Sequence, residues 1–285
     1  MKNCCDLHTH SAYSDGTLMP AELVAEAKNI GLSAVALTDH NTVAGLPEFF
    51  RAAQGTGVEA VGGIELSTDY GEVELHIVGL FIKEEHFDVI NQQVTAMMMR
   101  KDASNRQLCE ALQQSGYDVD LDEIKAKTPR GHINRAHIAS ALVEKGYVKS
   151  VGEAFASVLS KTAGFYNQPK RLDVFETIAL LKKIGCVSVL AHPFEEMDEA
   201  ALRGFLQKAK PCGLHAMETE YAKYDTETVQ KLKDIAKEFD IKESGGSDFH
   251  GDRRKGTYLG IGQGNLRVSK RFLDALRAEI QGGSV

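Results

Sequence analysis

The chain has 285 residues, of which 43% are hydrophobic and 26% are charged, an ordinary composition for a globular protein that buries a large core. The formal net charge of -7 argues against broad, non-specific nucleic-acid binding, so we expect no stable complex with DNA. The N-terminus lacks the apolar segment of a signal peptide, and the longest apolar runs are strand-sized, which argues against a membrane span. Five cysteines without C-x-x-C spacing fit reduced thiols, so a cytoplasmic protein is expected.

Short apolar, β-branched segments recur along the chain and are bounded by glycine or polar residues. Such segments are typical of strands that are covered on both faces. Amphipathic helical segments lie between several of them, one with Pro20 in its first turn and another after Asp173, a candidate N-cap. The predicted strands are 4–8, 33–38, 58–66, 73–81, 186–191, 214–218 and 243–247, and the predicted helices include 20–28, 173–184 and 226–239. Seven strands with intervening helices predict a parallel, closed or nearly closed α/β barrel.

Residues 84–170 show helical patterns without a strand candidate. They predict an inserted helical, substrate-binding subdomain between the fourth and fifth strands, so that residues 1–83 and 171–285 form the barrel. Residues 91–171 contain 12 Lys or Arg against 8 Asp or Glu, whereas the remainder of the chain is acidic, with 21 against 32. This asymmetry favours an anionic substrate held between the two parts, although solvated helix faces produce similar patterns.

Histidines and carboxylates gather where the predicted strands end. These residues are His8, His10, Asp15, His40, Glu65, His76, His192, Asp248 and His250. Because barrel enzymes carry their chemistry at the carboxyl ends of the strands, we expect these side chains to converge. Imidazole and carboxylate are the ligands of hydrolytic Zn, Mn and Fe sites, and nine ligands exceed the need of one ion. The sequence therefore predicts a multinuclear metal centre, with His76 as an exception because it falls inside its predicted strand.

A second cluster of polar residues lies within the insert. Arg130, His132, Arg135 and His137 crowd the first turn of a predicted helix, and Asn134 is its candidate N-cap. A helix N-terminus offers free N–H groups and a positive dipole end, and arginine adds affinity for phosphate. The cluster thus predicts a phosphate site, the alternative being a basic helix end on the surface.

The ligand motifs together resemble those of the PHP (polymerase and histidinol phosphatase) family. They are H-x-H near the N-terminus, T-D-H after the second strand, G-x-E after the third, a later H-P and a terminal S-D-x-H. The resemblance implies a distorted (β/α)7 TIM-like barrel, phosphoesterase activity and three divalent metal ions, for which we expect Mn, with Zn or Fe as alternatives. It assigns His8, His10, Glu65 and Asp248 to the first ion, Glu65, His76 and His192 to the second, and Asp15, His40 and His250 to the third.

Within the family, the chain resembles members with a helical insert, namely the 3′,5′-nucleoside bisphosphate phosphatases and the 5′-to-3′ exoribonucleases of the RNase AM type. The phrase from His137 to Tyr147 carries this finer resemblance. Where that group has G-R-P-H-I-A, this chain has Asn134 and Ala136 in place of glycine and proline. The resemblance implies that a hydroxide shared by two metals attacks the 3′-phosphate of a small nucleotide, with short RNA 5′ ends as further substrates. Arg130, Asn134, Arg135 and His137 would bind the substrate.

The general acid is left open by the sequence, with Asp39 and His215 as candidates. Asp39 could instead orient a histidine or cap the following turn. Tyr166 and Tyr221 could stack on a base or belong to the core. Three other functions compete: a histidinol-phosphate-type phosphatase with a single anion site, a metal-binding scaffold module without catalysis, and an amidohydrolase acting on C–N bonds.

Overall fold

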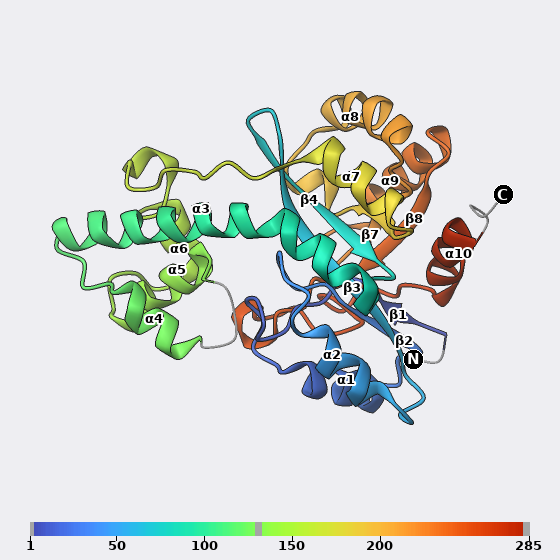
Figure 1. The fold of residues 1–285 in the computed structure, drawn as a ribbon, viewed down its shortest axis with the longest axis horizontal. Helices are drawn as coiled ribbons and strands as arrows, with labels where there is room; N and C mark the ends of the chain where they lie inside the picture. Colours follow the sequence, from blue (N-terminus) through green and yellow to red (C-terminus); the bar gives the residue numbers. More distant parts are fainter. Residues whose placement is uncertain (1–2, 129–132, 282–285) are drawn as a thin grey trace.

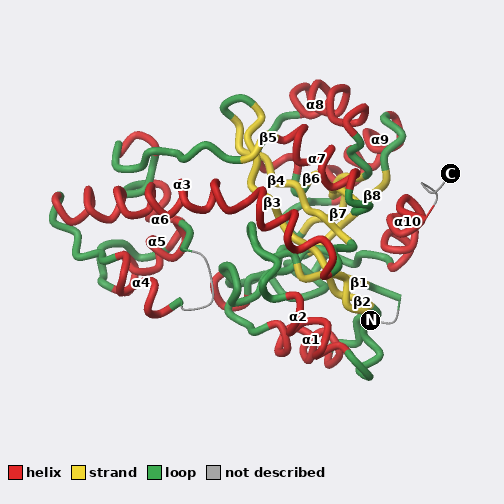
Figure 2. Tube along the Cα trace, viewed as in Figure 1, coloured by secondary structure: helices red, strands yellow, loops and turns green. Residues whose placement is uncertain are grey.

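The computed structural model describes residues 3–128 and 133–281. A barrel carries a group of helices that projects from one side, and both the first strand and the last helix belong to the barrel (Figure 1). Strands form the centre of the barrel and helices surround it (Figure 2). Among the described residues, the strands are β1 (Cys5–Asp6), β2 (Ala34–Leu37), β3 (Glu59–Tyr70), β4 (Val73–Leu80), β5 (Leu172–Asp173), β6 (Val187–Leu190), β7 (Ala216–Tyr221) and β8 (Lys242–Gly246).

Seven of these strands follow the order β1-β2-β3-β4-β6-β7-β8, and the short β5 pairs with β3. The first and last strands approach each other, since Leu7 N donates to Gly245 O at 3.2 Å and Asp248 N donates to His8 O at 2.9 Å. The sheet therefore forms a nearly closed barrel, and the predicted fold class is confirmed.

The prediction that all strands run parallel is wrong at β4, which is antiparallel to both β3 and β6. Only Gly71 and Glu72 separate β3 from β4, and Gly71 has a φ of 61°. A parallel crossover needs a dozen or more residues, so this short turn can only return the chain in the opposite direction. The other barrel neighbours, including β1–β2 and β7–β8, pair in parallel.

Apolar side chains of the strands alternate between the barrel interior and the surrounding helices, as the pleat requires. In β2, for example, Ala34 and Ala36 belong to the interior cluster, whereas Val35 and Leu37 pack in the outer layer. Helix α10 (Lys270–Gln281) adds Leu273 to the interior cluster and packs against β6 and β8. This helix covers the amino-terminal end of the barrel, which leaves the carboxyl end for the site.

The outer layer contains α1 (Pro20–Asn29), α2 (Leu46–Ala53), α7 (Val174–Lys183), α8 (Glu199–Cys212) and α9 (Thr226–Glu238). The three helices predicted from the sequence are among them. Asp173 caps α7 by accepting hydrogen bonds from Phe175 N and Glu176 N, at 2.9 and 3.0 Å. The predicted N-cap is confirmed, because an aspartate before an amphipathic segment can accept hydrogen bonds from the free N–H groups of the first helical turn.

The projecting helices are α3 (Phe87–Gln114), α4 (Leu121–Lys127), α5 (Arg135–Glu144) and α6 (Val151–Ala156), with short 3-10 turns at Glu84–His86 and Lys161–Ala163. In the described part of 84–170 there is no strand. Leu108 and Leu112 of α3 pack with Ile138 and Leu142 of α5 in a cluster separate from the barrel core. The amino-terminal half of α3 instead packs on the barrel, so this helix connects the two cores.

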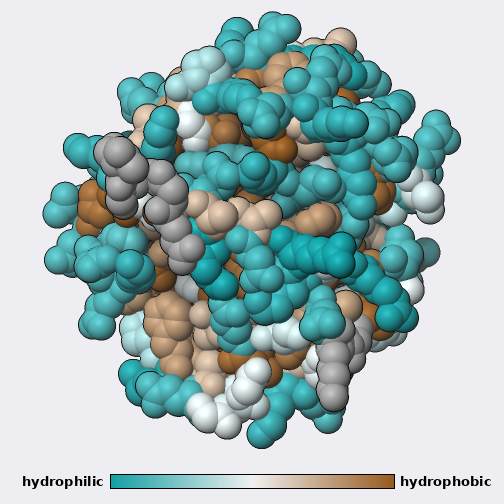
Figure 3. All heavy atoms as spheres, turned by 90° about the vertical axis from the view of Figure 1, so that its right-hand side faces the viewer, coloured by the Kyte–Doolittle hydropathy of each residue, from teal (hydrophilic) through white to brown (hydrophobic). Residues whose placement is uncertain are grey.

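Among the described helices, none has both the length and the apolar composition needed to cross a membrane. The face of the barrel turned away from the insert carries mostly hydrophilic side chains with apolar ones scattered among them (Figure 3). The five cysteines are all free thiols, and three of them are buried.

Candidate metal centre and substrate pocket

All nine predicted ligands meet at the carboxyl end of the barrel. Those from β1, β2, β6 and β8 follow the last residue of their strand, as the sequence predicted. His76 reaches the same place although it lies inside β4, because β4 runs in the opposite direction and pairs His76 with Ser67 of β3. The antiparallel direction of β4 thus explains why His76 joins the cluster although it lies inside a strand.

Glu65 lies at the centre of this cluster. Its Oε2 atom is 3.2 Å from Nε2 of both His8 and His10, and 3.0 Å from Nδ1 of His40. Its Oε1 atom is 2.8 Å from His76 Nδ1 and 3.2 Å from His192 Nε2. Five imidazoles therefore direct a nitrogen at one carboxylate, and Glu65 is only 1% exposed.

Two aspartates extend the cluster on either side of His10. Asp15 Oδ1 is 3.2 Å from His250 Nε2, and Asp15 Oδ2 is 3.8 Å from His40 Nε2. Asp248 Oδ1 is 3.2 Å from His10 Nε2 and 3.4 Å from His250 Nδ1. Three subsets have ligand atoms close enough to share an ion: His10, Asp15, His40 and His250; His8, His10 and Glu65; and His40, Glu65 and His76.

Buried polar atoms in this cluster lack hydrogen-bond partners, which is rare in folded proteins. Among the described residues these atoms are His8 Nε2, both ring nitrogens of His10, Asp15 Oδ1, His40 Nδ1, Glu65 Oε2, His76 Nδ1 and His192 Nδ1. Divalent cations would satisfy such nitrogen and oxygen donors, and the absence of a thiolate among them suits Mn, Zn or Fe. The donor set therefore fits metal ions.

Burial and mutual charge govern protonation here. Burial by itself would raise the pKa of Glu65, but His40 and His8 hold that pKa well below its usual value. Burial also acts to raise the pKa of Asp248, whereas the Arg254 guanidinium and His8 lower it well below its usual value. Both carboxylates are therefore ionised at neutral pH and available as ligands.

Several residues outside the predicted ligand set hold the cluster in place. Glu218 of β7 accepts a hydrogen bond from His8 Nδ1 at 2.9 Å and another from His192 N at 2.7 Å. Tyr221 donates to Asp248 Oδ2 at 2.9 Å, and Arg254 forms an ion pair with the same atom. A carboxylate inside an apolar strand segment, as in 214–218, was the signal that could have identified Glu218.

The backbone is strained at two of the cluster positions. His192 has a φ of 28° and Asp248 a φ of 53°, which non-glycine residues rarely adopt. Such conformations cost about 1–3 kcal/mol each and persist where surrounding contacts impose them. At Gly246 a side chain would lie 2.3 Å from the Cβ of His8, so only glycine lets β8 approach this closely.

The structure separates the two candidate acids from the ligands. Asp39 accepts hydrogen bonds from the backbone and hydroxyl of Ser11, at 2.7 and 2.6 Å, and from Ser14 Oγ at 2.6 Å. No described histidine is among its partners, so Asp39 holds the loop after β1. His215 precedes β7 at the amino-terminal end of the barrel, where its Nδ1 accepts from Ser188 N at 3.1 Å. The suggestion that His215 acts as the acid is wrong because it lies at the opposite end.

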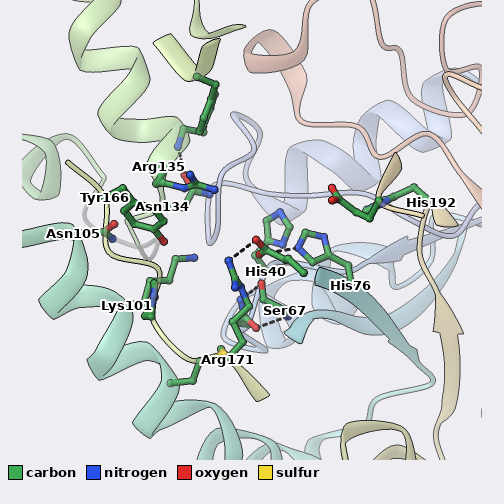
Figure 4. Close-up of a pocket in the computed structure, with 17 residues that line it drawn as sticks. His40, Ser67, His76, Lys101, Asn105, Asn134, Arg135, Tyr166, Arg171 and His192 are labelled. Carbon is green, nitrogen blue, oxygen red and sulfur yellow. Dashed lines mark hydrogen bonds and ion pairs between the residues drawn. The ribbon is translucent and has the colours of Figure 1, made fainter. Parts of the chain in front are cut away.

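A pocket of about 260 Å³ opens beside the cluster, between the barrel and the insert (Figure 4). His40, His76 and His192 form part of its barrel wall. On the opposite wall are Lys101 of α3, Asn134 and Arg135 at the start of α5, and Phe155, Tyr166 and Arg171 from the remainder of the chain around the insert. The pocket therefore has histidines on one side and cations on the other, and Glu74, which pairs with Arg171, and Glu196 also line it.

The predicted substrate-binding residues have different places. Arg130 lies outside the described residues. Asn134 caps α5 through Ala136 N at 3.0 Å and donates to Asp15 Oδ2 at 2.8 Å, which links the insert to the ligand cluster. The guanidinium of Arg135 lies over the Tyr166 ring, 4.3 Å from its centroid. His137 does not line the pocket; it is buried and its Nδ1 accepts from Asn134 N at 3.1 Å.

Of the two tyrosines considered for stacking on a base, only one lines the pocket. Tyr166 lines the pocket beneath Arg135, whereas Tyr221 is 2% exposed and bonds to Asp248. Arg171, which the sequence did not indicate, pairs with Asp69 at 3.0 Å and with Glu74. Lys101 was also missed, because a single lysine in a long helix is usually a solvated residue.

Comparison with known proteins gives the family. Residues 6–180 match the PHP domain. The chain is 34% identical over 250 residues to a 5′-3′ exoribonuclease of Haemophilus influenzae, covering 86% of this chain and 89% of that protein. It is 26% identical over 257 residues to a 3′,5′-nucleoside bisphosphate phosphatase of Chromobacterium violaceum, covering 90% of each. A crystal structure from Bifidobacterium adolescentis, assigned as a metal-dependent phosphoesterase, has a TM-score of 0.85 at 26% identity and covers 98% of this chain and 96% of that one. The chain thus belongs to the PHP domain family and is a metal-dependent phosphoesterase.

Proposed function

We propose that this protein hydrolyses the 3′-phosphate of 3′,5′-nucleoside bisphosphates and also trims the 5′ ends of short RNA. The observation that carries the proposal is the pocket beside the ligand cluster, where histidines face cations across a space of about 260 Å³. A substrate with two phosphates would place one at the cluster and the other at the cationic wall. The names of the exoribonuclease and bisphosphate phosphatase relatives support this substrate class.

The ligand cluster would hold three divalent ions, and we propose Mn. His8, His10, Glu65 and Asp248 would hold the first, Glu65, His76 and His192 the second, and Asp15, His40 and His250 the third. The grouping is supported by the distances around Glu65 and Asp15 and by the unsatisfied ring nitrogens. Bound there, the ions would supply Lewis acidity for the phosphate oxygens and for a water molecule.

The protein's own residues position these parts. Glu218 accepts from His8 Nδ1, which fixes the tautomer that leaves Nε2 free to act as a ligand. Asn134 ties the start of α5 to Asp15, so the insert lies in a defined place above the cluster. Arg135 would bind the phosphate that is not cleaved, and its stacking on Tyr166 holds the guanidinium in one orientation.

The two parts of the chain would have different roles. We propose residues 1–83 and 171–285 as the metal-binding barrel and 84–170 as the substrate-binding subdomain. The separate apolar cluster formed by Leu108, Ile138 and their neighbours supports the second unit. Packing of Ile90 and Val94 of α3 on the barrel core means that the connection between the two units is a continuous helix.

The test is phosphate release from Mn-reconstituted protein with adenosine 3′,5′-bisphosphate, AMP, 3′-AMP and histidinol phosphate. A strong preference for the bisphosphate is expected, because the monophosphates leave one wall of the pocket without a partner. Equal turnover of all four would contradict the second phosphate site. A preference for histidinol phosphate would favour the competing phosphatase, and metal-loaded protein without any turnover would favour the scaffold function.

A further inference from the structure

One face of helix α3 is buried along its whole length, across both the barrel and the insert. At steps of three or four residues, this face contains the buried Ile90, Val94, Met97, Asn105, Leu108 and Leu112 and the partly buried Lys101. The first three pack in the barrel's outer core and the last two in the core of the insert. Polar residues occupy the stripe only where α3 passes from one core to the other. That position is the pocket, since Met97, Lys101 and Asn105 all line it.

The two polar residues of the stripe differ in how they are satisfied. Asn105 donates from Nδ2 to Ile133 O at 2.9 Å, so its burial has a structural explanation. Lys101 is partly buried and has no hydrogen bond or ion pair with any described residue. Its side chain extends from α3 into the pocket beside Arg171 and Tyr166 (Figure 4). A partly buried ammonium group without a direct ion-pair partner is unfavourable, so the position favours a bound anion.

The electrostatics of the pocket agree with this interpretation. Burial lowers the pKa of Lys101, an effect that Asp15 and Glu74 oppose. Arg171 is already neutralised by Asp69 and Glu74. Arg135, by contrast, rests on Tyr166 and has no carboxylate partner among the described residues. Lys101 and Arg135 are therefore two cations without a direct ion-pair partner among the described residues, and they reach one pocket from different helices.

We propose that Lys101 binds, together with Arg135, the phosphate of the substrate that is not cleaved, and so determines specificity for a doubly phosphorylated nucleotide. This inference rests on the proposed function. A terminal phosphate carries close to two negative charges at neutral pH, which matches one ammonium and one guanidinium. The two are complementary, because arginine supplies a planar fork of donors and lysine a point charge.

The experiment compares Lys101→Met and Lys101→Arg with wild type, using adenosine 3′,5′-bisphosphate and p-nitrophenyl phosphate, which has one phosphate. Lys149→Met is the matched control, because Lys149 is an exposed lysine of the insert. For K101M the KM for the bisphosphate should rise roughly tenfold or more, the usual effect of losing one charge-assisted hydrogen bond. The kcat value and the turnover of p-nitrophenyl phosphate should stay close to those of wild type. K101R should restore much of the affinity, and K149M should resemble wild type.

Three results would overturn the assignment of Lys101: an unchanged KM in K101M, an equal loss with both substrates, or no rescue by K101R. Calorimetric binding of AMP to the metal-loaded proteins separates this inference from the proposed reaction. If wild type fails to hydrolyse the bisphosphate but binds AMP more tightly than K101M does, the reaction is wrong and the phosphate site stands. If the bisphosphate is hydrolysed and AMP binds both proteins equally, the reaction stands and the role of Lys101 is wrong.

Discussion

The two walls of the pocket are built from different elements. The barrel wall lacks cations to bind its buried donor atoms, and the insert wall lacks anions to pair with its cationic side chains. The barrel wall follows strand ends and gathers buried carboxylates and imidazoles whose atoms lack hydrogen-bond partners, with Glu65 at the centre. The insert wall comes from helices and presents Lys101 and Arg135 without carboxylate partners among the described residues. One wall requires cations and the other requires anions. Metal ions and a phosphorylated substrate together would satisfy both, which is why we propose chemistry at the barrel and recognition at the insert.

The largest effect should come from breaking the barrel wall at its centre. Glu65→Gln keeps the side-chain shape but removes the charge that five imidazoles face, so bound metal should be lost. Activity should fall by about a thousandfold or more, since metal ions contribute several kcal/mol to such reactions. Metal content measured by mass spectrometry, with circular dichroism to check folding, tests this. Glu59→Gln is the control, because Glu59 begins β3 and pairs with Arg277. An E65Q protein that retains metal and activity would contradict the barrel site.

A smaller effect should follow from removing a side chain that positions the predicted ligands of the barrel wall. Glu218→Gln removes the charge that holds His8 Nδ1 and the backbone of His192. Loss of such a supporting carboxylate lowers metal affinity roughly 10- to 100-fold, which competition with a chelator would measure. Glu220→Gln in the same strand is the control, since Glu220 pairs with Lys233 at 2.7 Å. Equal metal affinity in E218Q and E220Q would show that Glu218 does not position the ligands.

The stability of the protein should depend on pH through His137, which lies in the first turn of α5. Burial, followed by the charge of Arg253, lowers the pKa of His137 to about 4. The unfolded chain then binds more protons than the folded one between about pH 6.5 and pH 4, so the stability due to neutral His137 is lost as the pH falls through this window. At pH 5 wild type should lose about 2 kcal/mol of unfolding free energy relative to His137→Gln, which cannot titrate but can accept the same N–H. Urea unfolding at pH 7 and pH 5 measures this, and parallel losses in both proteins would contradict it.

The smallest effect should come from the insert wall. Arg135→Ala should raise the KM for adenosine 3′,5′-bisphosphate roughly tenfold and leave kcat nearly unchanged, because it removes binding that ground and transition states share. Arg106→Ala is the control, since Arg106 is an exposed arginine of the same insert paired with Asp122. Steady-state kinetics with both variants decides the point. Full activity of R135A would favour a histidinol-phosphate-type phosphatase. It would also contradict the proposal that the insert binds the second phosphate of the substrate.

The convergence of the nine predicted ligands could be anticipated because most of them stand close to the end of an apolar strand segment. A histidine or carboxylate after an apolar run is visible in the sequence at His40 or Asp248, and the barrel fold then implies that they converge. The direction of β4 was not predicted, although the two-residue turn at Gly71 contained the information. Glu218 was missed because its one signal, a carboxylate within the apolar segment 214–218, also fits a glutamate exposed to solvent at the edge of a strand.

The sequence alone therefore determined the barrel fold, the helical character of 84–170 and the convergence of nine histidines and carboxylates, because periodicity and residue chemistry act over short distances. Tertiary structure decided what surrounds them. It placed His215 at the far end of the barrel, turned Asp39 toward Ser11 and Ser14, and buried His137 away from the pocket. It also brought Lys101 of α3 and Arg135 of α5 to the same wall of the pocket. These outcomes depend on contacts between segments far apart in the chain, and on which buried polar atoms find partners there.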